Sequence, residues 1–146
     1  MSIYDQAKKQ GIELIDCLIK NSKHSSKNFC VFFDIDDTLI DSKNGKNIDQ
    51  IFNLYRHALS NKISTIIITA RPGFKNNITG TIKQLTENDI KNYDLLYFRP
   101  EYMTNLEEFK MFARRNAQEC GYTPLFSIGD MKWDVGEYGG IPILLQ

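Results

Sequence analysis

The sequence predicts an α/β protein with a doubly wound, mainly parallel five-stranded sheet and helices on both of its faces. Short apolar runs alternate with longer stretches of helical periodicity, the pattern of parallel strands joined by crossover helices. Several of these runs stop abruptly at polar residues, and ligand sites in this architecture lie at the carboxyl ends of strands. The apolar runs lie near 29–34, 63–69, 94–98, 125–129 and 141–145, and the helical stretches near 48–60, 74–88 and 104–119.

An amphipathic helix is predicted ahead of the first strand. Its apolar residues recur at approximately helical spacing, and the polar run from Asn21 to Lys27 follows them. Because such apolar stripes usually face a core, we expect residues 1–27 to pack on the sheet domain rather than to bind a partner. The stripe consists of Ile3, Ala7, Leu14, Ile15, Leu18 and Ile19.

The first strand is predicted to end in a reactive site. The apolar run Cys30–Phe33 leads directly into the acidic segment Asp34–Thr38. Carboxylates packed this closely repel one another and lose hydration unless a cation or a phosphate compensates them. Mg²⁺ suits this task because it prefers oxygen ligands and keeps positions free for water and a phosphoryl oxygen. The alternative is a plain acidic turn, since Asp is common in turns and at helix N-caps.

Later parts of the chain favour the reactive site over the plain turn. The second apolar run ends in Thr69 and Arg71, a hydroxyl and a cation that suit phosphate oxygens. Lys110 lies on a later helical stretch, and the fourth apolar run ends in Asp130, with Asp134 four residues further on. Two carboxylates at this spacing can flank one turn of a helix and face the same metal ion.

These segments resemble the four motifs of the haloacid dehalogenase (HAD) superfamily. The matching residues are Asp34–Thr38, Thr69, Lys110 and Gly129–Asp134, in that order, and they leave the segment before Asn28 outside the match. The first and fourth motifs are specific when they occur together. The resemblance implies a Rossmann-like, HAD-like core.

A finer likeness concerns one branch of the superfamily. The stretches Ile68–Pro72 and Tyr93–Pro100 resemble its acid-phosphatase-like members. Many superfamily members insert a cap domain after the first motif or before the lysine, but here neither gap is long enough to hold one. We therefore expect a capless, open site.

The resemblance implies phosphoryl transfer in two steps through an aspartyl-phosphate. Asp34 would be the nucleophile, and Asp36 the general acid and then the general base. Thr69 would donate a hydrogen bond to a phosphoryl oxygen, and Lys110 would neutralise charge on Asp34 and on the phosphoryl group. Lys75, Lys83 and Lys91 compete with Lys110 for this role; we favour Lys110 because it follows Phe109 beyond the third strand, where the family's lysine falls.

The metal and substrate contacts follow from the same likeness and from position. Mg²⁺ would be held by Asp34, the backbone carbonyl of Asp36 and Asp130, with Asp134 as a direct or water-mediated ligand. Arg71 and Arg99 each follow a strand end, so we predict that they bind a second phosphate or a carboxylate of the substrate, although each can equally pair with a surface acid. Asp37 and Asp41 are predicted to be turn residues.

Composition limits the classes of partner. The 146 residues suffice for a single domain over residues 1–146, and 18 basic against 18 acidic residues create no general field for nucleic acid or anionic membrane. The three cysteines lack metal-type spacing and favour reduced thiols inside a cell. With no apolar stretch of membrane-spanning length and no signal-peptide core, we expect a soluble cytoplasmic protein that does not bind membranes.

We therefore predict a Mg²⁺-dependent phosphomonoester hydrolase acting on a nucleotide or another small phosphate ester. A polynucleotide-end or phosphoprotein phosphatase is the first alternative, because an open site also accepts a bulky substrate. The sequence is also compatible with a homo-oligomer in which another subunit covers the site. A phosphoryl-transferring mutase normally needs a lid to exclude water. A catalytically silent binding protein would not need both Asp34 and Asp36.

Overall fold

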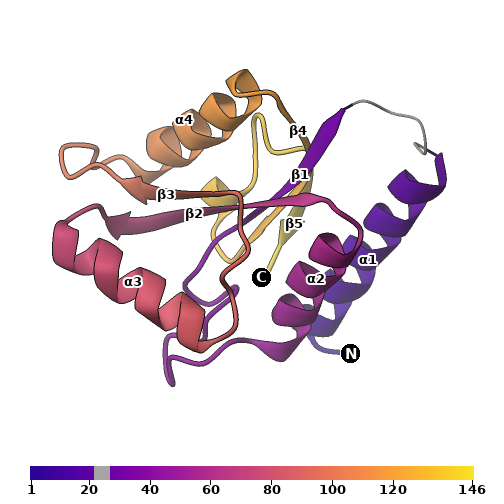
Figure 1. The fold of residues 1–146 in the computed structure, drawn as a ribbon, viewed down its shortest axis with the longest axis horizontal. Helices are drawn as coiled ribbons and strands as arrows, with labels where there is room; N and C mark the ends of the chain where they lie inside the picture. Colours follow the sequence, from indigo (N-terminus) through magenta and orange to yellow (C-terminus); the bar gives the residue numbers. More distant parts are fainter. Residues whose placement is uncertain (22–26) are drawn as a thin grey trace.

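A computed structural model describes residues 1–21 and 27–146 (Figure 1). Five parallel strands form one sheet in the order β3-β2-β1-β4-β5, which confirms the predicted doubly wound α/β fold. The strands are β1 (Asn28–Phe33), β2 (Ser64–Pro72), β3 (Leu95–Arg99), β4 (Tyr122–Gly129) and β5 (Ile141–Leu144). The helices are α1 (Ile3–Asn21), α2 (Asp49–Ser60), α3 (Lys75–Glu87), α4 (Leu106–Glu119) and the short 3₁₀ helix η1 (Lys132–Asp134).

The central strand β1 divides the core into two layers. Successive side chains of a strand point to opposite faces of the sheet. Val31 and Phe33 belong to the larger apolar cluster, which α1, α2 and α3 cover, whereas Cys30 and Phe32 belong to a smaller cluster beneath α4. Figure 1 shows α4 on one side of the sheet and the other three long helices on the opposite side.

Helix α1 packs on α2 through its apolar stripe. Ala7, Gly11 and Ile15 are buried, and a Cβ atom at Gly11 would lie 2.6 Å from Leu54 Cδ1, so the glycine allows the two helices to approach closely. The helix extends two residues beyond Ile19, to Asn21, and residues 22–26 of the predicted polar run lie outside the described part of the chain.

The register of the sheet places the ends of β1 and β4 next to each other, beside the middle of β2. Phe33 at the end of β1 pairs with Ile67 of β2 and with Ile128 of β4. The residues that follow, among them Asp34, therefore emerge at one edge of the sheet. The connections at this edge are short: residues 34–48 join β1 to α2, and residues 100–105 join β3 to α4. Neither segment forms a cap domain, as the gaps between the motifs predicted.

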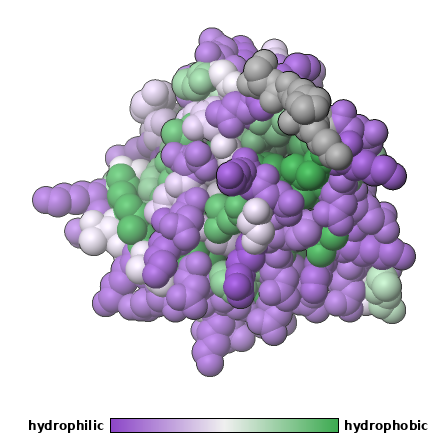
Figure 2. Space-filling model, turned by 45° about the vertical axis from the view of Figure 1, so that its right-hand side comes forward, coloured by the Kyte–Doolittle hydropathy of each residue, from purple (hydrophilic) through white to green (hydrophobic). Residues whose placement is uncertain are grey.

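The face shown in Figure 2 is largely hydrophilic, with apolar residues in small separate groups. In the described residues, none of the helices is both long enough and apolar enough to cross a bilayer.

Candidate active site

A hollow of about 220 Å³ lies at the carboxyl edge of the sheet, where β1 and β4 end. Pockets that enclose a whole small molecule measure roughly 300–1,000 Å³, so this hollow has room for a phosphate group rather than for an entire ester. Its charged lining residues are Asp34, Asp36, Lys110, Asp130 and Asp134, and its remaining ones are Ala70, Leu106, Met131 and Trp133.

Lys110 lies beneath this hollow and contacts two of its carboxylates. Its side chain projects from α4 and is buried, and Nζ lies 2.9 Å from Asp34 Oδ1, 2.7 Å from Asp134 Oδ1 and 2.7 Å from the carbonyl oxygen of Ile68. Two of these contacts, to Asp34 and to the Ile68 carbonyl, are hydrogen bonds, and the contact to Asp134 is an ion pair. The competing lysines at positions 75, 83 and 91 are all exposed.

The buried charges of Asp34 and Lys110 influence each other. Burial raises the pKa of Asp34 well above its usual range, although the nearby Lys110 ammonium opposes that rise. Burial alone would lower the pKa of Lys110, but the carboxylates of Asp34 and Asp134 outweigh it and raise the pKa. The lysine is thus kept as a cation, and Asp34 is costly to ionise without a further positive charge.

Three carboxylates, that of Asp34 among them, could together bind a cation that provides this positive charge. Asp34, Asp130 and Asp134 each offer an oxygen, and these oxygens all lie within 4.8 Å of one another. Burial also raises the pKa of Asp130, and the charge of Asp134 adds to the rise. Three carboxylates and one ammonium leave two negative charges, which a divalent cation would balance. Carboxylate oxygens are also the ligands that Mg²⁺ prefers, so the donor set fits this ion.

The two acids of the fourth motif differ in their contacts. Asp134 Oδ2 accepts a hydrogen bond of 3.0 Å from the Met131 backbone N–H, whereas its buried Oδ1 lies 2.7 Å from Lys110 Nζ as an ion pair and has no hydrogen-bond partner among the described residues. Asp130 is only partly buried, and its side chain faces the hollow. Asp34, Asp130 and Asp134 therefore each keep a carboxylate oxygen that could bind a cation.

Arg114 holds the backbone beside Asp134, a role that the sequence prediction did not include. Its buried guanidinium donates hydrogen bonds of 2.8 Å to the carbonyl oxygens of Trp133 and Glu137. Arg114 follows Lys110 by four residues, so both project from the same face of α4. This spacing was visible in the sequence, but the residues that Arg114 contacts were not.

Gly129 also fixes the position of Asp134. A Cβ atom at Gly129 would overlap the carboxylate of Asp134. We expect Gly129→Ala to displace this carboxylate and to weaken Mg²⁺ or Mn²⁺ binding by about 10–100-fold, the range seen when groups that orient metal ligands are lost. Isothermal titration calorimetry would measure the change.

The matched control for this prediction is Gly80→Ala. Gly80 lies in α3, and a Cβ atom there meets nothing within 4 Å. Alanine in a helix should leave metal affinity unchanged and raise stability by about 0.4–1 kcal/mol. Wild-type metal affinity in a folded Gly129→Ala protein would contradict the prediction.

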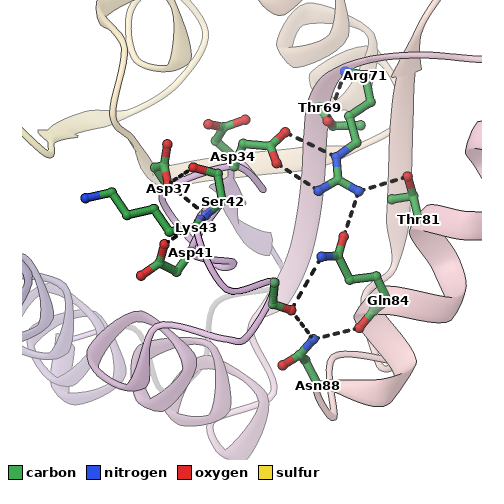
Figure 3. Close-up of polar contacts among 12 residues, drawn as sticks. Asp34, Asp37, Asp41, Ser42, Lys43, Thr69, Arg71, Thr81, Gln84 and Asn88 are labelled. Carbon is green, nitrogen blue, oxygen red and sulfur yellow. Dashed lines mark hydrogen bonds and ion pairs between the residues drawn. The ribbon is translucent and has the colours of Figure 1, made fainter.

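Asp36 lines the hollow, whereas Thr69 is not one of its lining residues but directly precedes Ala70, which is. Asp36 is an ion-pair partner of Arg71, whose Nε and Nη2 lie 3.1 and 2.8 Å from its two carboxylate oxygens. Thr69 is buried, and its hydroxyl accepts a hydrogen bond of 3.1 Å from the Arg71 backbone N–H, which leaves the hydroxyl proton free to donate elsewhere. Figure 3 shows Thr69 and Arg71 together at the end of β2.

Arg99 does not line the hollow. Its Nε donates a hydrogen bond of 2.9 Å to the Ala70 carbonyl oxygen, and Nη1 donates one of 3.0 Å to the Met103 carbonyl oxygen. These contacts tie β3 to the end of β2, so a substrate-binding role for Arg99 stays a prediction. Asp37 adopts a positive φ of 58° and accepts hydrogen bonds from Ser42, and Asp41 accepts one from the Lys43 backbone, as expected of turn residues.

Comparison with known proteins identifies the fold. No family profile and no curated protein matches the sequence. A solved structure of the class C acid phosphatase from Bacillus anthracis covers 90% of the chain at 14% identity, with a TM-score of 0.72. The chain has the fold of a class C acid phosphatase. This finding confirms the fold that the likeness to acid phosphatases implied.

A second structure of that acid phosphatase, with tungstate bound, covers 85% of the chain at 14% identity and a TM-score of 0.65. The chain spans 63% and 60% of the length of the two acid phosphatase chains. At this identity the likeness shows the fold, and the roles of individual residues are argued from their own contacts.

Proposed function

We propose that the chain is a Mg²⁺-dependent phosphomonoester hydrolase that forms an aspartyl-phosphate on Asp34. The observation that carries the proposal is the buried pair of Asp34 and Lys110 inside a cluster of three carboxylates. Such a cluster is costly for stability, because closely spaced carboxylates repel one another and lose hydration. Sites of this kind are typical of catalysis, in which charge develops on a substrate.

In the first step Asp34 attacks the phosphorus atom of the ester. A bond forms between its carboxylate oxygen and phosphorus while the bond from phosphorus to the leaving oxygen breaks, and Asp36 gives its proton to that oxygen. Thr69 donates a hydrogen bond to a phosphoryl oxygen, and the Lys110 ammonium favours the ionised form of Asp34. When bound by Asp34, Asp130, Asp134 and the carbonyl of Asp36, Mg²⁺ supplies positive charge for the phosphoryl oxygens.

In the second step Asp36 takes a proton from water. The water oxygen bonds to phosphorus as the bond to Asp34 breaks, so inorganic phosphate leaves and both carboxyl groups return to their starting forms. Each oxygen of Asp36 has a second lone pair beyond the one that Arg71 engages, so each can still accept a hydrogen bond from water.

The substrate we propose is a nucleotide or another small phosphate ester. The hollow has room for the phosphate group, and the apolar side chains of Leu106, Met131 and Trp133 border it. The rest of the ester would lie outside the hollow, where no cap domain covers it. A second candidate function is a phosphatase of polynucleotide ends or phosphoproteins, because an open site also admits a bulky substrate. The expected cytoplasmic location and a possible homo-oligomer stay predictions.

The test is phosphate release from a panel of nucleotides, sugar phosphates and 3′-phosphorylated oligonucleotides. We expect protein stripped with EDTA to be inactive and Mg²⁺ to restore release. We also expect Asp130→Asn to raise the Mg²⁺ concentration needed for half-maximal activity by at least about tenfold. Metal-independent release, or none from any ester by folded protein, would contradict the proposal. The preferred ester class would decide between the two candidate functions.

A further inference from the structure

The guanidinium of Arg71 is almost fully occupied by groups of the protein itself. Nε and Nη2 bind the two oxygens of Asp36, and Nη1 donates hydrogen bonds of 3.1 Å to Thr81 Oγ1 and 2.9 Å to Gln84 Oε1. Four of its five N–H donors are thus used. A guanidinium in this state has little left to offer to a substrate anion, which argues that Arg71 acts through Asp36.

The far side of Arg71 is anchored on α3. Thr81 is buried, and Gln84 uses both ends of its amide, because its Nε2 also donates a hydrogen bond of 3.4 Å to the carbonyl oxygen of Gly45. Asn88 donates hydrogen bonds of 3.1 Å to the same Gly45 carbonyl and 2.9 Å to that of Gln84. Figure 3 shows the contacts that connect Arg71 through Gln84 to Asn88.

The same network holds the loop that follows Asp36. The Asn47 backbone N–H donates a hydrogen bond of 2.8 Å to Asn88 Oδ1, and Gly45 adopts a positive φ of 72° that glycine tolerates without strain. Helix α3 therefore fixes Asp36 from two directions, through Arg71 at its carboxylate and through Gly45 and Asn47 at the loop behind it.

We infer that Arg71 is a positioning residue that holds the carboxylate of Asp36 in the orientation needed for proton transfer. The inference rests on the proposed function, in which Asp36 gives a proton to the leaving oxygen. The side chain of Asp36 is 47% exposed, so without a partner it would sample several rotamers. Two parallel N–H donors from a planar guanidinium define both its position and its plane.

Stability alone does not account for this arrangement. Ion pairs between solvent-accessible groups stabilise a protein by only about 0–1 kcal/mol. Exact placement of a catalytic group is worth much more, because a displacement of about 1 Å can lower a rate by about 100-fold. The half-exposed Asp36 remains open to a leaving group at the mouth of the hollow.

The leaving group of the ester gives a specific readout. An alkyl phosphate releases a strongly basic oxygen that needs a proton, whereas 2,4-dinitrophenyl phosphate releases a stable anion that needs none. The ratio kcat/KM covers steps up to the first bond cleavage, so it isolates the action of Asp36 as an acid. Loss of Asp36 positioning should therefore affect the two esters unequally.

The experiment compares wild type, Arg71→Met and Arg71→Lys on these two esters with Mg²⁺ present. We expect kcat/KM for the alkyl ester to fall by about 10–100-fold in both variants, and the value for the dinitrophenyl ester to stay near that of wild type. Lysine should not rescue the loss, because it cannot bind both oxygens of Asp36 in one plane. Adding Arg71→Met to Asp36→Asn should cause no further loss on the alkyl ester.

Two further variants guard against misfolding and general charge effects. Gln84→Met keeps Arg71 but removes one of its anchors, and should give a smaller loss with the same preference for the alkyl ester. Arg115→Met removes an exposed arginine of α4 that pairs with Glu119, and should leave both esters unaffected. Thermal unfolding of each variant shows whether it is folded.

Three results would overturn the inference. Equal losses on both esters would assign Arg71 a structural role, and a raised KM for both esters with unchanged kcat would assign it to substrate binding. Additive losses in the double variant with Asp36→Asn would separate the two residues. If wild type hydrolyses neither ester, the proposed function itself fails and takes the inference with it, a result distinct from the other three.

Discussion

Asp34→Asn is expected to abolish phosphate release while leaving the metal-free protein at least as stable as wild type. The amide cannot attack phosphorus, so turnover should fall by about 10⁴-fold or more, as for other lost nucleophiles. Stability should respond in the opposite direction. Burial raises the pKa of Asp34, so its ionised form costs free energy at neutral pH, and asparagine removes that charge while its oxygen still accepts a hydrogen bond from Lys110.

Two measurements on the same preparation check this pair of effects. Phosphate release reports the lost nucleophile, and urea unfolding in EDTA reports the stability of the metal-free protein. Asp89→Asn is the matched control, because Asp89 is exposed in the turn after α3 with a positive φ of 61°, a conformation that asparagine tolerates well. Release by Asp34→Asn at a rate near that of wild type would exclude Asp34 as the nucleophile.

The parts of the fold that the sequence predicted well depend on local patterns. Strand β1 alternates between two buried layers and ends at Asp34, so both its existence and its carboxyl end could be read from adjacent residues. Parallel strands place their carboxyl ends at one edge, which is why Asp34 and Asp130 could be brought together without coordinates. The acidic cluster follows from the same rule.

Element boundaries depended on features that are less visible in a sequence. Strand β4 begins at Tyr122, three residues before the predicted start at 125. The difference arises at Pro124, because proline is uncommon inside a strand and so gives no sign of one in the sequence. The pairing with β1 shifts between Cys30 and Val31, and this irregularity accommodates the proline within the sheet. Helix α4 begins at Leu106, after the predicted 104, because the Asn105 side chain caps it by accepting a hydrogen bond from the Glu108 backbone.

Side-chain partners distant in sequence were the least predictable. Nothing near Arg71 in the sequence specifies that it pairs with Asp36, because the two lie 35 residues apart and meet only after β1 and β2 align. The same holds for the contact between Gly129 and Asp134, which depends on how η1 folds back over the end of β4. A glycine before an aspartate gives no sign of this contact until the backbone path is known.

Lys110→Met is expected to abolish activity and, unlike Asp34→Asn, to destabilise the protein. Lys110 is the buried partner of both Asp34 and Asp134, at 2.9 and 2.7 Å. Removing one member of a buried ion-paired group leaves uncompensated charge and costs about 3–5 kcal/mol. Loss of its charge from the site should lower turnover by about 10²–10³-fold. Lys83→Met, which removes an exposed lysine of α3, is the control and should change neither property.

The pH dependence of this instability separates lost charge compensation from lost packing. Lys110 lowers the pKa of Asp34, so its removal raises that pKa further in the folded state. A group whose folded pKa lies above its unfolded value of about 3.9 stabilises the fold at low pH and loses this contribution as pH rises through the folded pKa. The deficit of Lys110→Met should therefore be largest near neutral pH and shrink toward about pH 5. Urea unfolding in EDTA at both pH values measures it, and a pH-independent deficit would show that the loss comes from packing.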